Sequence, residues 1–376
     1  MNIVDQGTVI ASSPKSDAAS CCFPSVCALP TGRWLVGFRL APAKLGRAQR
    51  AFVSWSDDQG GVWSPPVEVA PSPLAAGSPP GSWRAVACTP LGGSRVLAVL
   101  GWEDASDPLL PMFNEQTEGL VDMKLFTAVS GDGGAHFSPP QPVGCGAYDD
   151  SPTPTTGAIL VLPDGQWAAP FEVNKHYDDP NPWQHASCLT LSRDQGATWS
   201  EVIVVHSDPT RRMFCWDQRI AVLTDGTLLG LFWTFDRQAN AYLSIHSRGS
   251  NDSGRSWGPL TDAGVPGQPA RPVGLPDGRV VMVYVDRTAE PQIKARCSRD
   301  GGQTWPRESE LLIHERAAAR PETWNKQSMQ DAWAEMSAFS IGLPDAVALP
   351  NGDVLTVYYS GDRPDHTDVL WARIKA

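Results

Sequence analysis

The sequence predicts an all-β fold, a β-propeller of six blades with four antiparallel strands in each. One turn motif occurs five times, a second occurs six times, and short β-rich runs lie between them. Repeats of this length, each supplying one small sheet, are typical of propellers.

The first repeated motif reads Ser-x-Asp-x-Gly-x-x-(Trp or Phe). Its five copies begin at Ser56, Ser130, Ser192, Ser250 and Ser298. The aspartate can accept backbone N–H groups inside a tight turn, and the glycine supplies a positive φ. The final aromatic side chain fixes the turn to its neighbour. We therefore expect structural roles for Asp57 or Asp58, Asp132, Asp194, Asp252 and Asp300.

The second motif is a hairpin turn that begins with leucine and most often reads Leu-Pro-x-Gly. Its six copies begin at Leu29, Leu91, Leu162, Leu223, Leu275 and Leu349. Short β-rich runs follow, such as residues 280–285 and 354–359. Each unit therefore reads as strand, leucine turn, strand, loop, strand, aspartate motif, strand. Both kinds of turn should lie on one face of the disc, with a substrate face opposite.

The last unit lacks an aspartate motif, so another segment has to complete it. A ring must close or expose a sheet edge, and residues 7–11 at the N-terminus can supply the missing outer strand. One helix is expected at roughly Asn325 to Met336, inside a segment from His314 to Ser337 that we expect over the substrate face. No linker interrupts the pattern, which favours a single domain over residues 1–376.

Composition excludes several functions. The 376 residues carry a net charge of −11, so no excess of positive charge exists to bind nucleic acid. No apolar run is long enough to span a membrane, and the N-terminus has no signal-peptide pattern. We expect a cytoplasmic protein, unless a leader was removed from it, and no cofactor. The oligomeric state is left open.

The eight cysteines show no zinc-binding spacing. A chain of this size needs no disulfide framework, so free buried thiols are the favoured interpretation. The adjacent pair Cys21 and Cys22 is the one place where we would test for oxidation.

The aspartate motifs are similar to the Asp boxes of the sialidase superfamily, and the chain resembles that superfamily along nearly its whole length. The resemblance implies the six-bladed propeller, with the Asp boxes on the rim away from the substrate. Arg237 and Arg287 resemble two members of the family's arginine triad, and Asp217 lies near its blade-four glutamate. Because Asp boxes also occur in non-catalytic propellers, they imply fold more strongly than chemistry.

The chain departs from true sialidases at three places. Residues 22–24 read Cys-Phe-Pro where the family has Arg-Ile-Pro, so the first carboxylate-binding arginine is missing. No aspartate between Arg39 and Ser54 matches the family's acid/base, and Phe339 stands nearest to its tyrosine nucleophile. The usual cleavage of sialic acid is therefore not expected.

Polar side chains gather at the blade ends that should form the substrate face. Glu172 and Asp217 are the candidate acid/base pair, since two nearby carboxyls can cleave a glycosidic bond. Guanidinium groups bind carboxylates bidentately, and Arg84 could replace the missing first-blade arginine. Mutual pairing of these charges without catalysis is the competing interpretation. The candidate substrate-binding residues are Arg84, Glu103, His176, Trp216, Arg219, Arg237 and Arg287.

These features favour a sialidase-like glycoside hydrolase with a carbohydrate substrate, most simply an acidic or exo-positioned sugar. Two alternatives stay open. One is a non-catalytic carbohydrate-binding propeller, and the other is a polysaccharide lyase in which His176 or Tyr177 abstracts a proton next to a uronate carboxylate.

Overall fold

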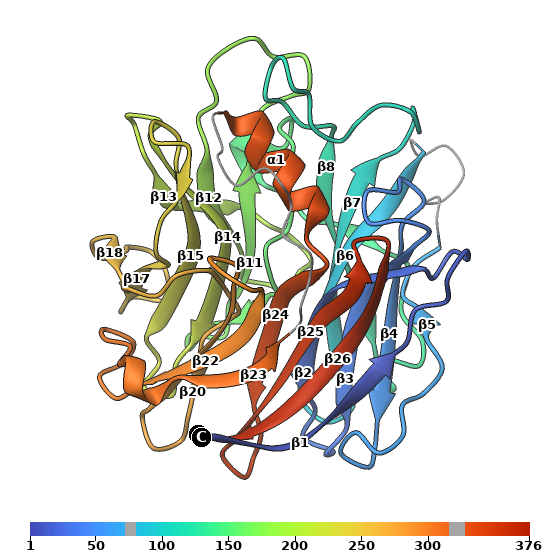
Figure 1. Ribbon diagram of the computed structural model, residues 1–376, viewed down its shortest axis with the longest axis vertical. Helices are drawn as coiled ribbons and strands as arrows, with labels where there is room; N and C mark the ends of the chain where they lie inside the picture. The colour runs from blue at the N-terminus through green and yellow to red at the C-terminus, as the bar shows by residue number, and fades with distance from the viewer. Residues whose placement is uncertain (72–79, 316–327) are drawn as a thin grey trace.

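The computed structural model describes residues 1–71, 80–315 and 328–376, which form β-sheets arranged as a propeller (Figure 1). In spatial order, the first sheet contains β6 (Gly81–Pro90), β7 (Val96–Asp104), β8 (Met123–Ser130) and β9 (Gln141–Pro142), and the second contains β10 (Leu160–Val161), β11 (Trp167–Val173), β12 (Ala186–Ser192) and β13 (Glu201–Ser207). The third contains β14 (Met213–Val222), β15 (Leu228–Asp236), β17 (His246–Ser250) and β18 (Thr261–Asp262), with β16 (Ala241–Tyr242) beside β15. The fourth contains β19 (Gln268–Pro269), β21 (Val280–Asp286), β22 (Gln292–Ser298) and β23 (Leu311–Glu315), with β20 (Val273–Gly274) beside β21.

The fifth sheet has eight strands and contains both ends of the chain. In spatial order they are β24 (Ile341–Ala348), β25 (Asp353–Arg363), β26 (His366–Lys375), β2 (Ser20–Ala28), β3 (Trp34–Ala41), β4 (Arg50–Ser56) and β5 (Val67–Glu68), with β1 (Asn2–Ile10) also beside β26. A single parallel pairing, Ser20 with Thr367, joins β2 to β26. The hydrogen bonding thus gives five sheets, and the expected number of six blades stays a prediction.

The N-terminal strand closes the ring as expected. β1 pairs antiparallel with β26, from Asn2 opposite Lys375 to Ile10 opposite Val369. The strand begins five residues earlier than the run at 7–11 that suggested it, and it covers the otherwise open outer edge of β26.

The leucine turns and the Asp boxes lie at the same end of the strands. Trp34, the first residue of β3, pairs with Ala28 before the leucine turn and with Ser56 at the start of an Asp box. The same double pairing occurs at the first residue of the second strand in the other four sheets: Val96, Trp167, Leu228 and Val280. The opposite strand ends are therefore free to build a site.

The Asp boxes share a common set of hydrogen bonds, and three of them add a hydroxyl donor from the residue four positions after the aspartate. Ser256 donates to Asp252 through its backbone N–H at 2.9 Å and its hydroxyl at 2.5 Å, and the hydroxyl of Ser250 donates at 2.8 Å. The amide of Gly254 in turn donates to Ser250 at 2.9 Å. The matching aspartates of the other boxes are Asp58, Asp132, Asp194 and Asp300. In the first box Asp58 takes this place, while Asp57 pairs with Arg33.

We expect Asp252→Ala to destabilise the fold without affecting the substrate face, because it removes three accepted hydrogen bonds from one turn. The melting temperature should fall by about 2–6 °C. Scanning calorimetry would measure it, with Asp150→Ala, an exposed aspartate outside the boxes, as the control. Equal melting temperatures for the two variants would contradict the structural role.

The Asp boxes also predict acid sensitivity. Hydrogen bonds from Ser256 lower the pKa of Asp252 to about 2, and Asp132, Asp194 and Asp300 likewise have pKa values of about 2. Because these values lie below the unfolded pKa of about 3.9, the folded carboxylates add stability above pH about 4 that is lost as the pH falls through about 2. Urea unfolding at pH 5, 4 and 3 should show this decline, and Asp252→Ala should show less of it.

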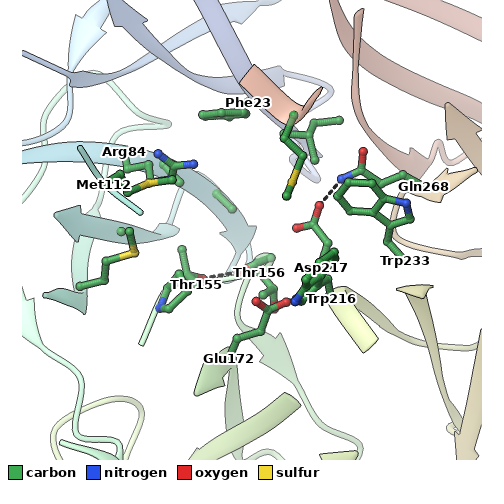
Figure 2. Close-up of a pocket in the computed structure, with 18 of the residues that line it drawn as sticks. Phe23, Arg84, Met112, Thr155, Thr156, Glu172, Trp216, Asp217, Trp233 and Gln268 are labelled. Carbon is green, nitrogen blue, oxygen red and sulfur yellow. Dashed lines mark hydrogen bonds between the residues drawn. The ribbon is translucent and has the colours of Figure 1, made fainter. Parts of the chain in front are cut away.

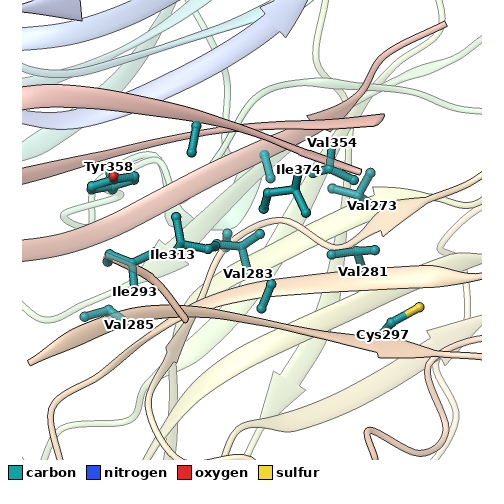
Figure 3. Packing of buried hydrophobic residues seen from close by; sticks show 14 of the residues in the cluster. Val273, Val281, Val283, Val285, Ile293, Cys297, Ile313, Val354, Tyr358 and Ile374 are labelled. Carbon is teal, nitrogen blue, oxygen red and sulfur yellow. The ribbon is translucent and has the colours of Figure 1, made fainter. Parts of the chain in front are cut away.

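Apolar side chains from neighbouring strand groups fill the space between the blades. Figure 3 shows one such cluster, in which Val281 and Val283 of β21 pack with Val354 of β25 and Ile374 of β26. Strands buried on both faces therefore read as continuous apolar runs, which is why residues 280–285 stood out in the sequence.

One α-helix interrupts the strands in the described part of the chain. Helix α1 (Met329–Ala338) begins after Ser328, whose hydroxyl accepts the backbone N–H of Asp331 at 3.2 Å. It starts later than the expected helix from Asn325 to Met336, and residues 325–327 lie outside the described residues. Two short 3-10 helices, η1 (Gly146–Tyr148) and η2 (Arg307–Ser309), lie in loops. None of the described helices is long and apolar enough to cross a membrane.

All eight cysteines are free and buried. Burial raises the pKa of Cys21 and of Cys27 to about 12, which keeps these thiols protonated. Cys22, next to Cys21, has no exposed surface.

Candidate functional site

A cavity of about 250 Å³ opens at the strand ends opposite the leucine turns (Figure 2). Side chains from all five sheets line it: Phe23 in β2, Arg84 in β6, Glu172 in β11, Asp217 in β14, Gln268 in β19 and Leu343 in β24. The α-helix adds Trp333, Met336 and Ser337. The cavity therefore lies where the blades converge, as expected for the substrate face.

Three of these lining residues share an unusual backbone conformation. Phe23, Asp217 and Leu343 have φ values of +54°, +52° and +39°, and each stands six residues before a turn leucine. Each also lies in a β-bulge of its strand. Bulges re-aim side chains, and positive φ is costly for Phe and Leu but better tolerated by Asp. Of the three, Asp217 alone carries a charge, so the fold does not require a carboxylate there.

The two candidate carboxylates are linked directly. Glu172 is 8% exposed, and its Oε1 accepts the backbone N–H of Asp217. Asp217 Oδ1 accepts Arg219 Nη2 at 3.1 Å, and its Oδ2 accepts the side-chain amide of Gln268. Figure 2 shows the Asp217 and Gln268 side chains directed toward each other. The positive-φ bulge thus presents both the N–H and the carboxylate of Asp217 to the cavity.

The hydrogen-bond network continues from Gln268 to Arg287. The Gln268 carbonyl accepts Arg287 Nη1 at 2.9 Å, while Arg287 Nη2 donates to the backbone oxygen of Ile341 at 2.8 Å. The guanidinium also lies 3.9 Å above the ring of Phe339. Burial lowers the pKa of Arg287, and each of its three nitrogens donates a hydrogen bond within the protein.

Arg84 is the more accessible cation in the cavity. Its side chain is 27% exposed, and Nη1 contacts Glu103 Oε2 at 3.3 Å. Glu103 is 1% exposed and also contacts Arg47 Nε at 3.1 Å. Glu103 therefore supports Arg84 from beneath and does not line the cavity. Arg84 and Arg39 flank the ring of Phe23 at 5.3 and 4.5 Å, beside the place of the missing first-blade arginine.

Lys44 lines the cavity and anchors helix α1. Its Nζ donates to the backbone oxygens of Met336 and Phe339 at 2.7 and 2.6 Å, at the C-terminal end of the helix. Burial lowers its pKa to about 7, and Arg287 nearby adds to the decrease. No sequence motif pointed to this lysine, because it lies in an irregular loop.

Tryptophans form much of the cavity wall. The five that line it are Trp102, Trp183, Trp216, Trp233 and Trp333. Trp216 stacks on Phe235 at 5.1 Å, Trp233 on Tyr242 at 4.6 Å and Trp333 on Phe113 at 4.7 Å. Stacked rings of this kind form a rigid aromatic wall. Of the five, only Trp216 was among the expected site residues.

Six of the nine expected site residues line the cavity: Arg84, Glu172, Trp216, Asp217, Arg219 and Arg287. The other three lie elsewhere, and a role for them in binding stays a prediction. Glu103 lies beneath Arg84, His176 is exposed, and Arg237 pairs with Glu118. Tyr177, the other proposed lyase base, is also absent from the lining. The strand-end position of Arg237 could be predicted by counting along the repeat. The conformation of the loop that brings Glu118 to Arg237 could not be predicted in this way.

The segment expected over the substrate face is only partly described. Residues 316–327 lie outside the described residues, and helix α1 supplies the three lining residues named above. In the described part of the chain, no three His, Cys, Asp or Glu side chains gather as metal ligands would.

The model of the BNR repeat-like domain family matches residues 103–355. The chain belongs to this family. Its fold is also that of solved sialidase-type propellers, which the sequence resemblance had implied. A comparison with curated protein sequences finds no match.

Three solved structures illustrate the likeness. A protein of unknown function from Dyadobacter fermentans has a TM-score of 0.75 and 19% identity, with 100% of this chain and 99% of that chain covered. A Hadza microbial sialidase has a TM-score of 0.66 and 15% identity, with 96% and 66% covered. A leech intramolecular trans-sialidase, complexed with 2,7-anhydro-Neu5Ac, has a TM-score of 0.67 and 11% identity, with 99% and 70% covered. At these identities the likeness shows the fold.

Proposed function

We propose that this protein is a glycoside hydrolase that removes a sugar from the end of a glycan by a route other than that of conventional sialidases. The observation that carries the proposal is that Glu172 and Asp217 face one tryptophan-lined cavity and are joined by a hydrogen bond. Paired carboxyl groups in such a cavity fit the requirements of glycosidic bond cleavage. Sialidases among the similar folds support a carbohydrate substrate.

The two carboxyl groups have different surroundings and so different proposed roles. Glu172 is mostly buried beside aromatic rings, and it would donate the proton to the glycosidic oxygen as the C–O bond breaks. Asp217 accepts hydrogen bonds from Arg219 and Gln268, which hold its two oxygens in place. Its carboxylate would stabilise the positive charge that develops at the anomeric carbon.

The cations in the wall support an acidic sugar as substrate. One guanidinium nitrogen of Arg84 forms an ion pair with Glu103, and the rest of the side chain retains exposed surface at the cavity. A planar guanidinium can bind a carboxylate on the sugar through two parallel hydrogen bonds. The tryptophan platforms would hold the apolar faces of the same sugar ring.

A carbohydrate-binding protein without catalysis is the second candidate. It is favoured by the hydrogen bonds that occupy both oxygens of Asp217, since such pairing can be purely structural. The lyase alternative has less support, because His176 and Tyr177 do not line the cavity.

We also propose that the ring has six blades within a single domain. The eight-stranded sheet consists of two antiparallel groups joined by one parallel pairing, at Ser20 and Thr367. Division at that point leaves six units of comparable size around the cavity.

Incubation with a glycan panel, followed by mass analysis of the products, tests the proposed function. A hydrolase should release a terminal sugar with one added water and a new reducing end. A lyase product would instead absorb in the near ultraviolet. Retention of intact glycans without products would favour the binding protein and overturn the hydrolase proposal.

A further inference from the structure

Glu172 has a neighbour, directly before the adjacent strand β12, that no sequence motif indicated. Glu172 in β11 pairs with Ser187 in β12. His185 lies two residues before Ser187, so its side chain lies on the same face of the sheet, diagonal to Glu172. The structure places His185 Nε2 3.6 Å from Glu172 Oε2.

The imidazole of His185 is almost completely enclosed, with 2% of its surface exposed. Its ring stacks against Phe214 at 5.5 Å and meets the edge of Trp183 at 6.1 Å. Within the described parts of the chain, neither ring nitrogen has a hydrogen-bond partner. Buried polar groups nearly always have one, and an exception in a folded protein indicates a functional role or an additional bound group.

Three titratable groups in the neighbouring strands are uncharged around neutral pH. His206 in β13 faces His185, and burial together with Arg248 lowers the pKa of His206 to about 4. Burial raises the pKa of the Cys188 and Cys215 thiols, in β12 and β14, to about 12. These groups do not compete with Glu172 for a charge interaction with His185.

Asp217 in β14 is hydrogen-bonded to Glu172, and its own carboxylate is already engaged. Its carboxylate accepts Arg219 and Gln268, and its backbone N–H donates to Glu172 Oε1. Asp217 thus holds one oxygen of Glu172, while the other oxygen, Oε2, faces His185.

We propose that His185 is a positioning residue for Glu172, an inference that rests on the proposed hydrolase function. When Glu172 gives its proton to the glycosidic oxygen, the bonding electron pair goes to that oxygen and a carboxylate is left among aromatic rings. The Nε2–H of His185 then donates to Oε2 and stabilises this carboxylate. The 3.6 Å separation is longer than a hydrogen bond, and catalytic contacts of this kind often shorten when substrate binds.

Two substitutions separate the hydrogen bond from the packing. His185→Phe retains a ring against Phe214 but removes the donor, and His185→Gln keeps an N–H near the place of Nε2. His246→Gln is the control, because His246 lies in β17 with its Nδ1 bonded to the backbone oxygen of Ser244.

On a glycan that the wild-type protein cleaves, His185→Phe should lower kcat by about 10–100-fold with little change in KM. Its pH–rate profile should extend to higher pH, because a carboxylate that has lost its donor retains its proton longer. His185→Gln should restore most of both properties, and His246→Gln should match the wild type.

A nuclear magnetic resonance measurement tests the contact without using turnover. In protein labelled with ¹⁵N-histidine, the His185 Nε2 resonance should move in Glu172→Gln and stay in place in Glu201→Gln, a surface control. An unmoved resonance in Glu172→Gln would overturn the contact.

The kinetic outcomes separate the two proposals. Loss of activity in Glu172→Gln, with wild-type kinetics and pH profile in His185→Phe, would overturn the role of His185 and leave the hydrolase proposal standing. Full activity in Glu172→Gln would overturn the hydrolase proposal and the role of His185 together.

Discussion

Glu172→Gln should reduce kcat by about 10²–10⁴-fold, the range typical for loss of a general acid. Glutamine has the size of glutamate, and its amide oxygen can still accept the backbone N–H of Asp217. What disappears is the proton that the leaving oxygen needs. The melting temperature should stay close to that of the wild type, because no apolar packing is lost.

The matched control for this substitution is Glu201→Gln. The same chemical change is made at Glu201 in the outer strand β13, where the glutamate pairs with Arg193 at 3.2 Å on the surface. Its kinetics should equal those of the wild type. Comparable activity of the two variants on a cleaved glycan would contradict the role of Glu172.

Asp217→Asn should reduce kcat by about 10²–10³-fold with an intact fold. Asparagine tolerates the left-handed backbone conformation at this position, where φ is +52°. It lacks the negative charge that would stabilise the transition state. Its amide NH₂ group also cannot accept one of the hydrogen bonds that Arg219 and Gln268 now donate to Asp217. Steady-state kinetics and the melting temperature, measured together, separate the two effects.

Asp217→Gly serves as the companion variant, because glycine adopts positive φ freely and retains the N–H that Glu172 accepts. If the carboxylate is essential, both variants lose activity. Activity retained in Asp217→Gly would show that only the backbone N–H matters at this position, and would contradict a role for the carboxylate.

Local motifs made most of the fold predictable. Asp boxes and leucine turns are determined by residues within about eight positions of one another, so their spacing fixes the order and direction of the strands. Closure by β1 followed from the unit that lacked an outer strand. The start of α1 was less predictable, since helix ends depend on caps such as Ser328 and on the surface beneath.

The site was predictable only where regular strands supply it. Counting from the turn leucines led to Asp217, which lines the cavity, and Phe23 and Leu343 have the same positive φ at the equivalent positions. Lys44 and Trp333 come from a loop and a helix whose conformations no repeat encodes. Arg237 occupies an expected strand end, but an ion pair with Glu118 engages it away from the cavity lining. Tertiary packing of the loops thus decided which charges reach the cavity.

The departures from true sialidases have a structural counterpart in the cavity. Phe339, at the nearest place to the family's tyrosine, follows the last residue of α1 and lies against Arg287. Phe23 occupies the bulge next to Cys22, and its ring lies between Arg39 and Arg84. Aromatic packing against guanidinium groups thus occupies the place nearest to the family's tyrosine and the position beside the missing arginine, which directs attention to Glu172 and Asp217.

Hydrolysis in water enriched in ¹⁸O tests the central claim most directly. The wild-type protein and the Glu172→Gln and Glu201→Gln variants would each be incubated with a glycan panel, and released sugars would be analysed by mass. We expect one ¹⁸O atom at the new reducing end for the wild type and Glu201→Gln, and almost no product from Glu172→Gln. Bound glycan without any product, or an unsaturated product without ¹⁸O, would contradict the account.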